Sequence, residues 1–351
     1  MEQSIRHNVF SAGFRLIAAA RAERWLAPVA RGAGAILMFH HVRPWRPRAF
    51  APNRLLEITP AFLDRTLRVA REMGFDLIPL DEVPERLRGP GRRPFVVLTF
   101  DDGYRDNAEY ALPVLKRHGA PWTLFVSADY AEGRGRLWWL ELEEAIVRLD
   151  RVEMTAGRDA LDLPCRNPRE KQAAFAAIYW RLRAGSEEHL RSGIAALADR
   201  TGVDSAGLVR ALCLSWDELR TLAGESGVTI GAHTLSHPML AKHDRETAWR
   251  EIAASRAAIA EKLGLTARHF AYPVGDPASA GPRDFALAAE AGFETAVTTR
   301  PGHVFSAHAE HLHALPRVSV NGLFQSEAAL RSLLSGVPFL AWNRGRRLNV
   351  A

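Results

Sequence analysis

Short apolar runs alternate with longer helical patterns along most of this chain, and this alternation limits the fold more than any other feature. The runs are rich in branched and aromatic residues and cover residues 35–39, 76–79, 95–100, 122–127, 228–232, 269–273, 295–299 and 316–320. Strands that are apolar throughout and separated by helices form parallel sheets covered on both faces. Seven or eight such units favour an α/β protein closed into a barrel, with an open doubly wound sheet as the alternative.

Helix signals between the runs support the same interpretation. Thr59 followed by Pro60 is a good N-cap and first-turn pair, and the helix that it begins should end at Gly74. The segment 245–263 repeats apolar residues at helical spacing and ends at Gly264, as an outer helix of a barrel would. The sequence contains neither GxGxxG after an early strand nor GxxxxGK[ST], so no nucleotide-binding fingerprint favours the open sheet.

The alternation is interrupted between about residues 137 and 214. This stretch indicates several helices, with Trp138 and Trp139 among charged residues, and we interpret it as a helical insertion in a loop. We therefore expect three parts: an N-terminal basic amphipathic helical segment over residues 1–34, a barrel domain over 35–325, and a C-terminal helix with a basic tail over 326–351.

Charge and cysteine content limit the class of protein. The net charge of +6 is carried by scattered arginines rather than one tract, so we expect no nucleic-acid partner. Cys165 and Cys213 form no CxxC pair, which argues against thiolate zinc sites and suits a reducing compartment. The N-terminal apolar residues are interrupted by charges, so we expect neither a signal peptide nor a membrane span. A cytoplasmic location follows, with peripheral contact with the inner membrane face left open.

Two adjacent carboxylates follow the apolar run 95–100. Asp101 and Asp102 come directly after this run, and barrel enzymes keep their chemistry at the carboxyl ends of strands. Two adjacent ionised carboxylates repel each other, which is costly unless the two groups have different chemical roles. A divalent cation separates the roles, because one carboxylate binds the ion while the other accepts a proton from water. The alternative is a solvated Asp-Asp-Gly turn.

Two histidines follow the apolar run 228–232 in the same way. His233 and His237 are four residues apart, so both imidazoles can reach one ion. One carboxylate and two imidazoles leave coordination positions open for water and substrate, which is typical of a catalytic metal site. We expect Zn²⁺, with Co²⁺, Ni²⁺ or Mn²⁺ as alternatives.

These two segments resemble the first two motifs of the polysaccharide deacetylase family, also called the NodB homology domain or carbohydrate esterase family 4. The matching stretches are Thr99-Phe-Asp-Asp-Gly-Tyr104 and His233-Thr-Leu-Ser-His237, and Phe270-Ala-Tyr-Pro-Val-Gly275 is similar to the third motif in one branch. The resemblance runs from about residue 35 to residue 320. It implies a distorted (β/α)7 barrel with a helical insertion and an N-terminal helix.

The resemblance also implies an activity and its residues. Asp101 would be the catalytic base, Asp102, His233 and His237 would hold the metal, and the substrate would be an N-acetylated oligosaccharide or polysaccharide that loses its acetyl groups. An O-acetyl esterase of the xylan type and a non-catalytic saccharide-binding barrel at the membrane surface are the alternatives. A glycosidase fits less well, because adjacent aspartates cannot flank a glycosidic bond.

The general acid has two candidates. His40, in Phe39-His40-His41-Val42, resembles the early histidine of one branch of the family, and a strand end suits a general acid. His313, in Leu312-His313, resembles the late L-x-H motif. We favour His40. The family's arginine that orients the base stands in R-x-x-P, whereas Arg268 precedes Pro273 at a different spacing.

The sequence also suggests residues that contact the substrate. We expect backbone N–H groups near Tyr104 or after Pro273 to stabilise the oxyanion. Tyr272 is a candidate platform for stacking on a sugar ring, as are Trp138 and Trp139, although helix packing is the commoner role of a tryptophan in such a segment. The sequence does not specify the identity of the sugar, the length of the saccharide chain or the oligomeric state of the protein.

Overall fold

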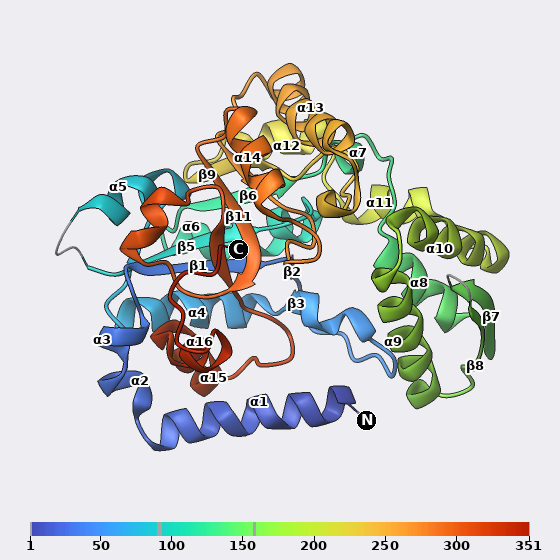
Figure 1. Cartoon of the computed structure of the whole chain (residues 1–351), viewed down its shortest axis with the longest axis horizontal. Helices are drawn as coiled ribbons and strands as arrows, with labels where there is room; N and C mark the ends of the chain where they lie inside the picture. The colour runs from blue at the N-terminus through green and yellow to red at the C-terminus, as the bar shows by residue number, and fades with distance from the viewer. Residues whose placement is uncertain (1, 90–92, 157–158, 351) are drawn as a thin grey trace.

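Seven parallel strands form a closed barrel in the computed structural model, which describes residues 2–89, 93–156 and 159–350 (Figure 1). The sheet order is β1-β12-β11-β10-β9-β6-β5, and β1 also pairs with β5, which closes the ring. The strands are β1 (Gly34–Phe39), β5 (Phe95–Phe100), β6 (Trp122–Val126), β9 (Val228–Ala232), β10 (His269–Ala271), β11 (Thr295–Pro301) and β12 (Leu315–Ser319). The predicted (β/α)7 barrel is confirmed.

The barrel strands form where the sequence has its apolar runs. β5 and β9 begin and end at the predicted residues, and β1 and β5 are buried at every position. Their pairing places Phe39 opposite Phe100, so the residues that follow, His40 and Asp101, leave the barrel at the same edge. The one predicted run that lies outside the ring, residues 76–79, forms β4 (Asp76–Leu77), a short strand that pairs with the start of β5.

Helices cover the outside of the barrel. Thr59 caps α4 (Pro60–Glu72) by accepting from the Phe62 N–H, and α13 (Arg245–Leu263) ends at Gly264 in the left-handed conformation. The other covering helices are α5 (Val83–Arg88), α6 (Leu112–Arg117), α7 (Ala128–Ala131), α12 (Trp216–Ala223) and α14 (Pro282–Glu290). Short elements complete the connections: β2 (His41–Val42), η1 (Pro52–Leu56), β3 (Glu57–Ile58), η2 (Leu80–Glu82), η3 (Asn107–Ala111), η4 (Leu240–Lys242) and η5 (Ser306–Glu310).

The insertion forms a second body beside the barrel (Figure 1). It contains α8 (Trp138–Val147), α9 (Pro168–Ala184), α10 (Glu187–Thr201) and α11 (Ser205–Leu212). Their apolar residues form a cluster that also includes Phe50, Tyr104, Tyr130 and Met239 of the barrel domain. The insertion also contains an antiparallel pair, β7 (Arg151–Ala156) and β8 (Asp159–Pro164), so the prediction of helices alone was incomplete. Apolar residues alternate with polar ones there, as in a strand with one buried face.

The two ends of the chain meet on one side of the barrel. The N-terminal helices are α1 (Glu2–Ala19), α2 (Ala22–Trp25) and α3 (Ala27–Ala30), and the C-terminal ones are α15 (Glu327–Ser335) and α16 (Val337–Trp342). The rings of Phe10 and Phe14 pack edge-on against Phe324, with centroids 6.1 and 5.3 Å away. Among the described residues, no helix combines the length and apolarity that a membrane span requires.

Candidate active site

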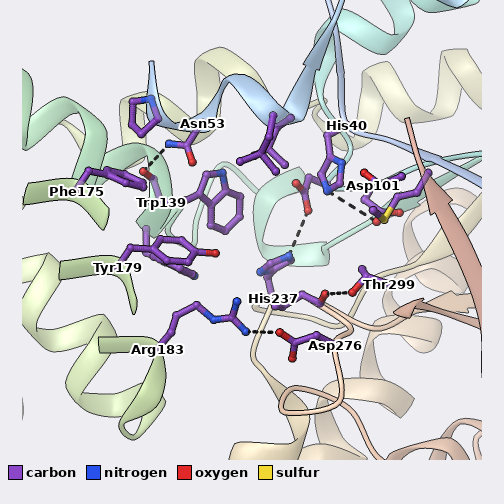
Figure 2. A pocket seen from close by; sticks show the side chains of 18 of the residues that line it. His40, Asn53, Asp101, Trp139, Phe175, Tyr179, Arg183, His237, Asp276 and Thr299 are labelled. Carbon is purple, nitrogen blue, oxygen red and sulfur yellow. Dashed lines mark hydrogen bonds and ion pairs between the residues drawn. The ribbon is translucent and has the colours of Figure 1, made fainter. Parts of the chain in front are cut away.

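Three loops that leave the same edge of the barrel bring the predicted chemistry together. His40 follows β1, Asp101 and Asp102 follow β5, and His233 and His237 follow β9. All five residues line one cavity of about 360 Å³ (Figure 2). Because the carboxyl ends of parallel strands meet at one edge, segments distant in sequence converge there.

Asp102 faces both histidines. Its Oδ1 lies 3.4 Å from Nε2 of His233 and 3.3 Å from Nε2 of His237, and all three side chains are buried. One ligand atom from each residue lies within 4.8 Å of the other two. Asp102 Oδ1 has no hydrogen-bond partner among the described residues, which is costly for a buried oxygen unless a cation fills the gap. The three residues therefore fit a metal ion.

Second contacts orient the histidine ligands. His233 Nδ1 donates to the carbonyl oxygen of Ala271 at 2.7 Å, which leaves the Nε2 lone pair free for a cation. The Ser127 hydroxyl donates to the His233 carbonyl at 2.7 Å, and the Thr234 hydroxyl accepts from the His237 N–H at 3.0 Å. The His233 imidazole is thus oriented by the end of β10, whereas the backbone of both histidines is fixed by neighbouring hydroxyls.

The backbone around the site is strained. Asp102, Thr234, His237 and Val274 have φ angles of 71°, 65°, 59° and 61°, in the left-handed region that non-glycine residues rarely adopt. Each such residue costs roughly 1–2 kcal/mol, and strain of this kind gathers at functional sites. The folded protein holds these residues in conformations that their own preferences disfavour.

Asp101 has a different partner from Asp102. The guanidinium of Arg317 donates through Nη1 and Nη2 to the two carboxylate oxygens of Asp101, at 2.7 Å each. Arg317 also donates to the Thr298 carbonyl and the Thr99 hydroxyl, and both charged side chains are buried. Burial alone would raise the pKa of Asp101, but the charge and hydrogen bonds of Arg317 outweigh it and lower the pKa. Asp101 is thus held ionised and oriented.

His40 is the candidate acid that reaches this site. Its Nε2 lies 4.0 Å from Asp101 Oδ2, and its side chain lines the cavity. Burial lowers the pKa of His40. His313 lies elsewhere: its Nε2 donates to the Phe293 carbonyl at 2.8 Å, and it is not among the residues that line the cavity. The geometry favours His40 over His313 as the acid.

The arginine that contacts Asp101 was not identified from the sequence. Arg268 lies on the surface, with its side chain 47% exposed, and pairs with Glu294 and Asp81 instead. Arg317 instead makes the contact with Asp101 that the resemblance had led us to expect of an R-x-x-P arginine. A signal for it existed, because an arginine within an apolar barrel strand must find a buried counter-charge.

The other predicted substrate contacts are mostly buried. Tyr272 is fully buried and its hydroxyl donates to the His313 carbonyl, so its ring cannot stack on a sugar, and that prediction was wrong. Tyr104 is also fully buried and stacks on His41. Pro273 is buried, but the next residue, Val274, lines the cavity.

Trp138 and Trp139 are largely buried, yet both contribute to the cavity wall. The insertion thus supplies aromatic surface opposite the metal ligands (Figure 2).

A closed parallel barrel with two carboxylates and two histidines at its carboxyl edge defines a hydrolase of the β/α-barrel class. The model of the polysaccharide deacetylase family matches residues 88–296. This match covers more than half of the chain, which therefore belongs to the polysaccharide deacetylase family. No curated protein matches the chain significantly.

Solved structures of deacetylases share the fold. The deacetylase PplD of Streptococcus pyogenes, in complex with acetate, aligns with 20% identity and a TM-score of 0.53, covering 82% of this chain and 92% of that one. IcaB from Ammonifex degensii aligns with 18% identity and a TM-score of 0.54, covering 87% and 97%. A de-N-acetylase from Aggregatibacter actinomycetemcomitans aligns with 12% identity and a TM-score of 0.51, covering 85% and 98%. At these identities the likeness shows the fold alone.

Proposed function

We propose that this protein is a metal-dependent hydrolase that removes N-acetyl groups from N-acetylglucosamine-type oligosaccharides or polysaccharides and releases acetate. One observation carries the proposal: the two adjacent carboxylates have different partners. Asp102 faces the imidazoles of His233 and His237, whereas Asp101 is held by Arg317. Zinc suits this donor set best, and cobalt, nickel and manganese are alternatives.

The chain's own groups divide the steps of hydrolysis. A cation bound at the three ligands would polarise the acetyl carbonyl and lower the pKa of a coordinated water. Asp101 accepts the proton of the attacking water, and Arg317 keeps the carboxylate oriented toward it. His40 donates a proton to the sugar nitrogen as the C–N bond breaks. Water is consumed, and the products are acetate and a free amino sugar.

The position of His40 supports cleavage of an amide rather than an ester. An amine must be protonated as it leaves, whereas the alkoxide of an ester is a better leaving group and depends less on an acid. An O-acetyl esterase of the xylan type is the second candidate, since the same ligands and base would serve it. Analysis of the product separates the two, because N-deacetylation leaves a free amine and O-deacetylation leaves a hydroxyl.

Acetate release by the metal-stripped protein tests the proposal. Chitin oligomers are incubated with the stripped protein, and Zn²⁺, Co²⁺, Ni²⁺ or Mn²⁺ is added back in turn. We expect acetate only after an ion is restored. A non-catalytic saccharide-binding barrel would bind the oligomers without releasing acetate, and its binding would be indifferent to an Asp101→Asn change.

The N-terminal helices support a second part of the proposal, a cytoplasmic location with peripheral contact with the inner membrane face. Leu16 and Trp25 are 71% and 63% exposed, and the exposed Arg15 and Arg21 precede them closely in the sequence. Exposed apolar side chains next to arginines suit an anionic lipid surface. Co-sedimentation with anionic vesicles should be stronger than with zwitterionic ones and should fall for a Trp25→Ala variant. Equal sedimentation would argue against membrane contact.

A further inference from the structure

One face of α9 forms the wall of the cavity opposite the metal ligands. Phe175, Tyr179 and Arg183 are spaced by four residues and therefore lie along one side of the helix. All three line the cavity, together with Trp139 from α8, and Figure 2 shows their side chains turned toward His237. The candidate active site thus lies between the barrel and the insertion, and both contribute to its walls.

An ion pair connects the insertion to the barrel on one side of the cavity. Arg183 Nη2 donates to Asp276 Oδ2 at 2.8 Å and to the Ser279 hydroxyl at 3.2 Å. Asp276 lies in the loop that follows β10, and the Arg183 side chain is only 10% exposed. This contact, the Arg183–Asp276 bridge, closes the gap between α9 and the barrel at that point (Figure 2).

Hydrogen bonds close the gap on the opposite side. The Asn53 amide nitrogen donates to the Trp139 carbonyl at 2.9 Å and to Glu143 Oε2 at 2.8 Å. Asn53 belongs to η1 of the barrel domain, whereas Trp139 and Glu143 belong to α8 of the insertion. In Figure 2, Asn53 and the Arg183–Asp276 bridge lie on opposite sides of His237. The insertion is therefore bonded to the barrel domain at two separate points of the cavity wall.

Two exposed apolar side chains stand at the mouth of the cavity. Trp180 and Leu55 both line the cavity and are 60% and 39% exposed, so they stand at its rim. The volume of about 360 Å³ lies near the lower limit of small-molecule sites. A broad aromatic face at the rim can stack on the apolar face of a pyranose ring.

We propose that the cavity is a closed pocket that accepts only the terminal N-acetylated unit of a saccharide, while the next unit stacks on Trp180 at the mouth. This inference rests on the proposed deacetylase function and concerns which unit of the chain is processed. An internal unit has a neighbour on both sides, and the second neighbour would collide with Asn53 or with the Arg183–Asp276 bridge. Short oligosaccharides and chain ends fit; the interior of a polymer does not.

The pattern of products tests the inference directly. Fully N-acetylated chitooligosaccharides of two to six units are incubated with the metal-loaded protein, and the free amine is located by tandem mass spectrometry. We expect one acetate per chain, always from the same end, whatever the length. Products deacetylated at internal units would overturn the inference but leave the deacetylase function intact. No acetate from any oligomer would contradict the deacetylase function itself, and the terminal-unit inference with it.

Variants that open the pocket give a second test. In Arg183→Ala and Asp276→Ala the bridge is lost, so internal units should begin to appear among the deacetylated products. Arg245→Ala is the matched control, because its ion pair with Glu290 lies on the surface between α13 and α14. Unchanged products from both opened variants, with folding verified by circular dichroism, would contradict the role of the bridge. If the variants fail to fold, the product pattern of the unaltered protein still decides.

A third variant tests the mouth. Trp180→Ala should raise the KM for the oligosaccharides roughly fivefold, the effect expected for one lost aromatic contact. The KM for N-acetylglucosamine alone should stay the same, because a single unit does not reach the rim. An equal rise for both substrates would show that Trp180 does not bind a second unit.

Discussion

The guanidinium of Arg317 binds both carboxylate oxygens of Asp101 from two strands away. Arg317 lies on β12 and Asp101 follows β5, and β1 stands between these two strands in the barrel. This bidentate contact fixes the plane of the carboxylate. It also explains why the pKa of Asp101 is lowered although this carboxylate is buried next to Asp102.

Replacement of Arg317 by lysine should therefore impair catalysis while keeping the charge. The lysine ammonium lacks the planar fork that matches both carboxylate oxygens, so the plane of the Asp101 carboxylate would no longer be fixed, and we expect kcat to fall roughly 100-fold. Acetate release measures the effect, and thermal unfolding shows whether the barrel survives. Arg268→Lys is the control on an exposed arginine and should leave kcat within about twofold. Equal losses in the two variants would remove Arg317 from the mechanism.

Asp101→Asn should abolish turnover without removing the metal. An amide cannot accept the proton of the attacking water, and general-base catalysis contributes about 100- to 10,000-fold. The metal content of the purified variant, measured by elemental mass spectrometry, should match that of the unaltered protein. Loss of the ion from the Asp101→Asn variant would instead identify Asp101 as a metal ligand.

His40→Gln should affect amide and activated ester substrates differently. We expect deacetylation of chitooligosaccharides to fall roughly 100- to 1000-fold, because the leaving amine loses its proton donor. Hydrolysis of p-nitrophenyl acetate should change much less, since its leaving group needs no proton. His313→Gln is the matched control and should change neither rate. An equal fall in the rates for both substrates in His40→Gln would show that His40 is not the acid.

Metal removal should lower both activity and stability. An ion that binds only the folded state adds about 4 kcal/mol at a concentration 1000 times its Kd. Chelation should therefore lower the Tm, and addition of Zn²⁺ should restore it. His237→Ala should abolish this response, whereas His311→Ala, which replaces an exposed histidine, should retain it. A Tm that is indifferent to the ion in the unaltered protein would speak against a site at Asp102.

The buried His308 should make stability depend on pH. Burial lowers the pKa of His308 to about 4, and its Nδ1 accepts from the Phe305 N–H at 3.0 Å. Because the unfolded chain binds this proton near pH 6.5, stability falls as the pH drops from about 6.5 toward 4. The free energy of unfolding in urea should decrease about 2 kcal/mol more between pH 7.5 and pH 5 than in His308→Asn. Asparagine can accept the same hydrogen bond but does not titrate. Parallel pH curves would contradict the prediction.

The barrel and the metal-binding cluster could be predicted because their signals are local. An apolar run ends where a strand ends, so β5 and β9 were placed to the residue, and the polar groups that follow each run had to meet at one edge. The hairpin of β7 and β8 carried a similar local signal, the alternation of apolar and polar residues, but a charged segment between helices hid it.

Partners that are distant in sequence could not be predicted in the same way. Arg317 has a local mark, its place within a predicted apolar strand, but the sequence does not say which carboxylate it meets, and only the closed barrel brings it to Asp101. His40 and His313 each stand in a motif-like setting, and only the folded chain shows that His40 lines the cavity beside Asp101 whereas His313 contacts the Phe293 carbonyl. The helical spacing of the residues of α9 could be predicted from the sequence. The face of α9 that lines the cavity, however, depends on how the insertion packs.

The two strands that close the barrel also contribute residues to the candidate active site. β1 and β12 pair with each other, Leu37 opposite Val318, and they carry His40 and Arg317. A fragment restricted to residues 88–296 would keep every candidate metal ligand, yet it would lack both strands that close the ring. Such a fragment could acquire an ion and still be inert. During synthesis, too, the chain would become active only after its last strand had paired with its first. Activity therefore requires the complete fold.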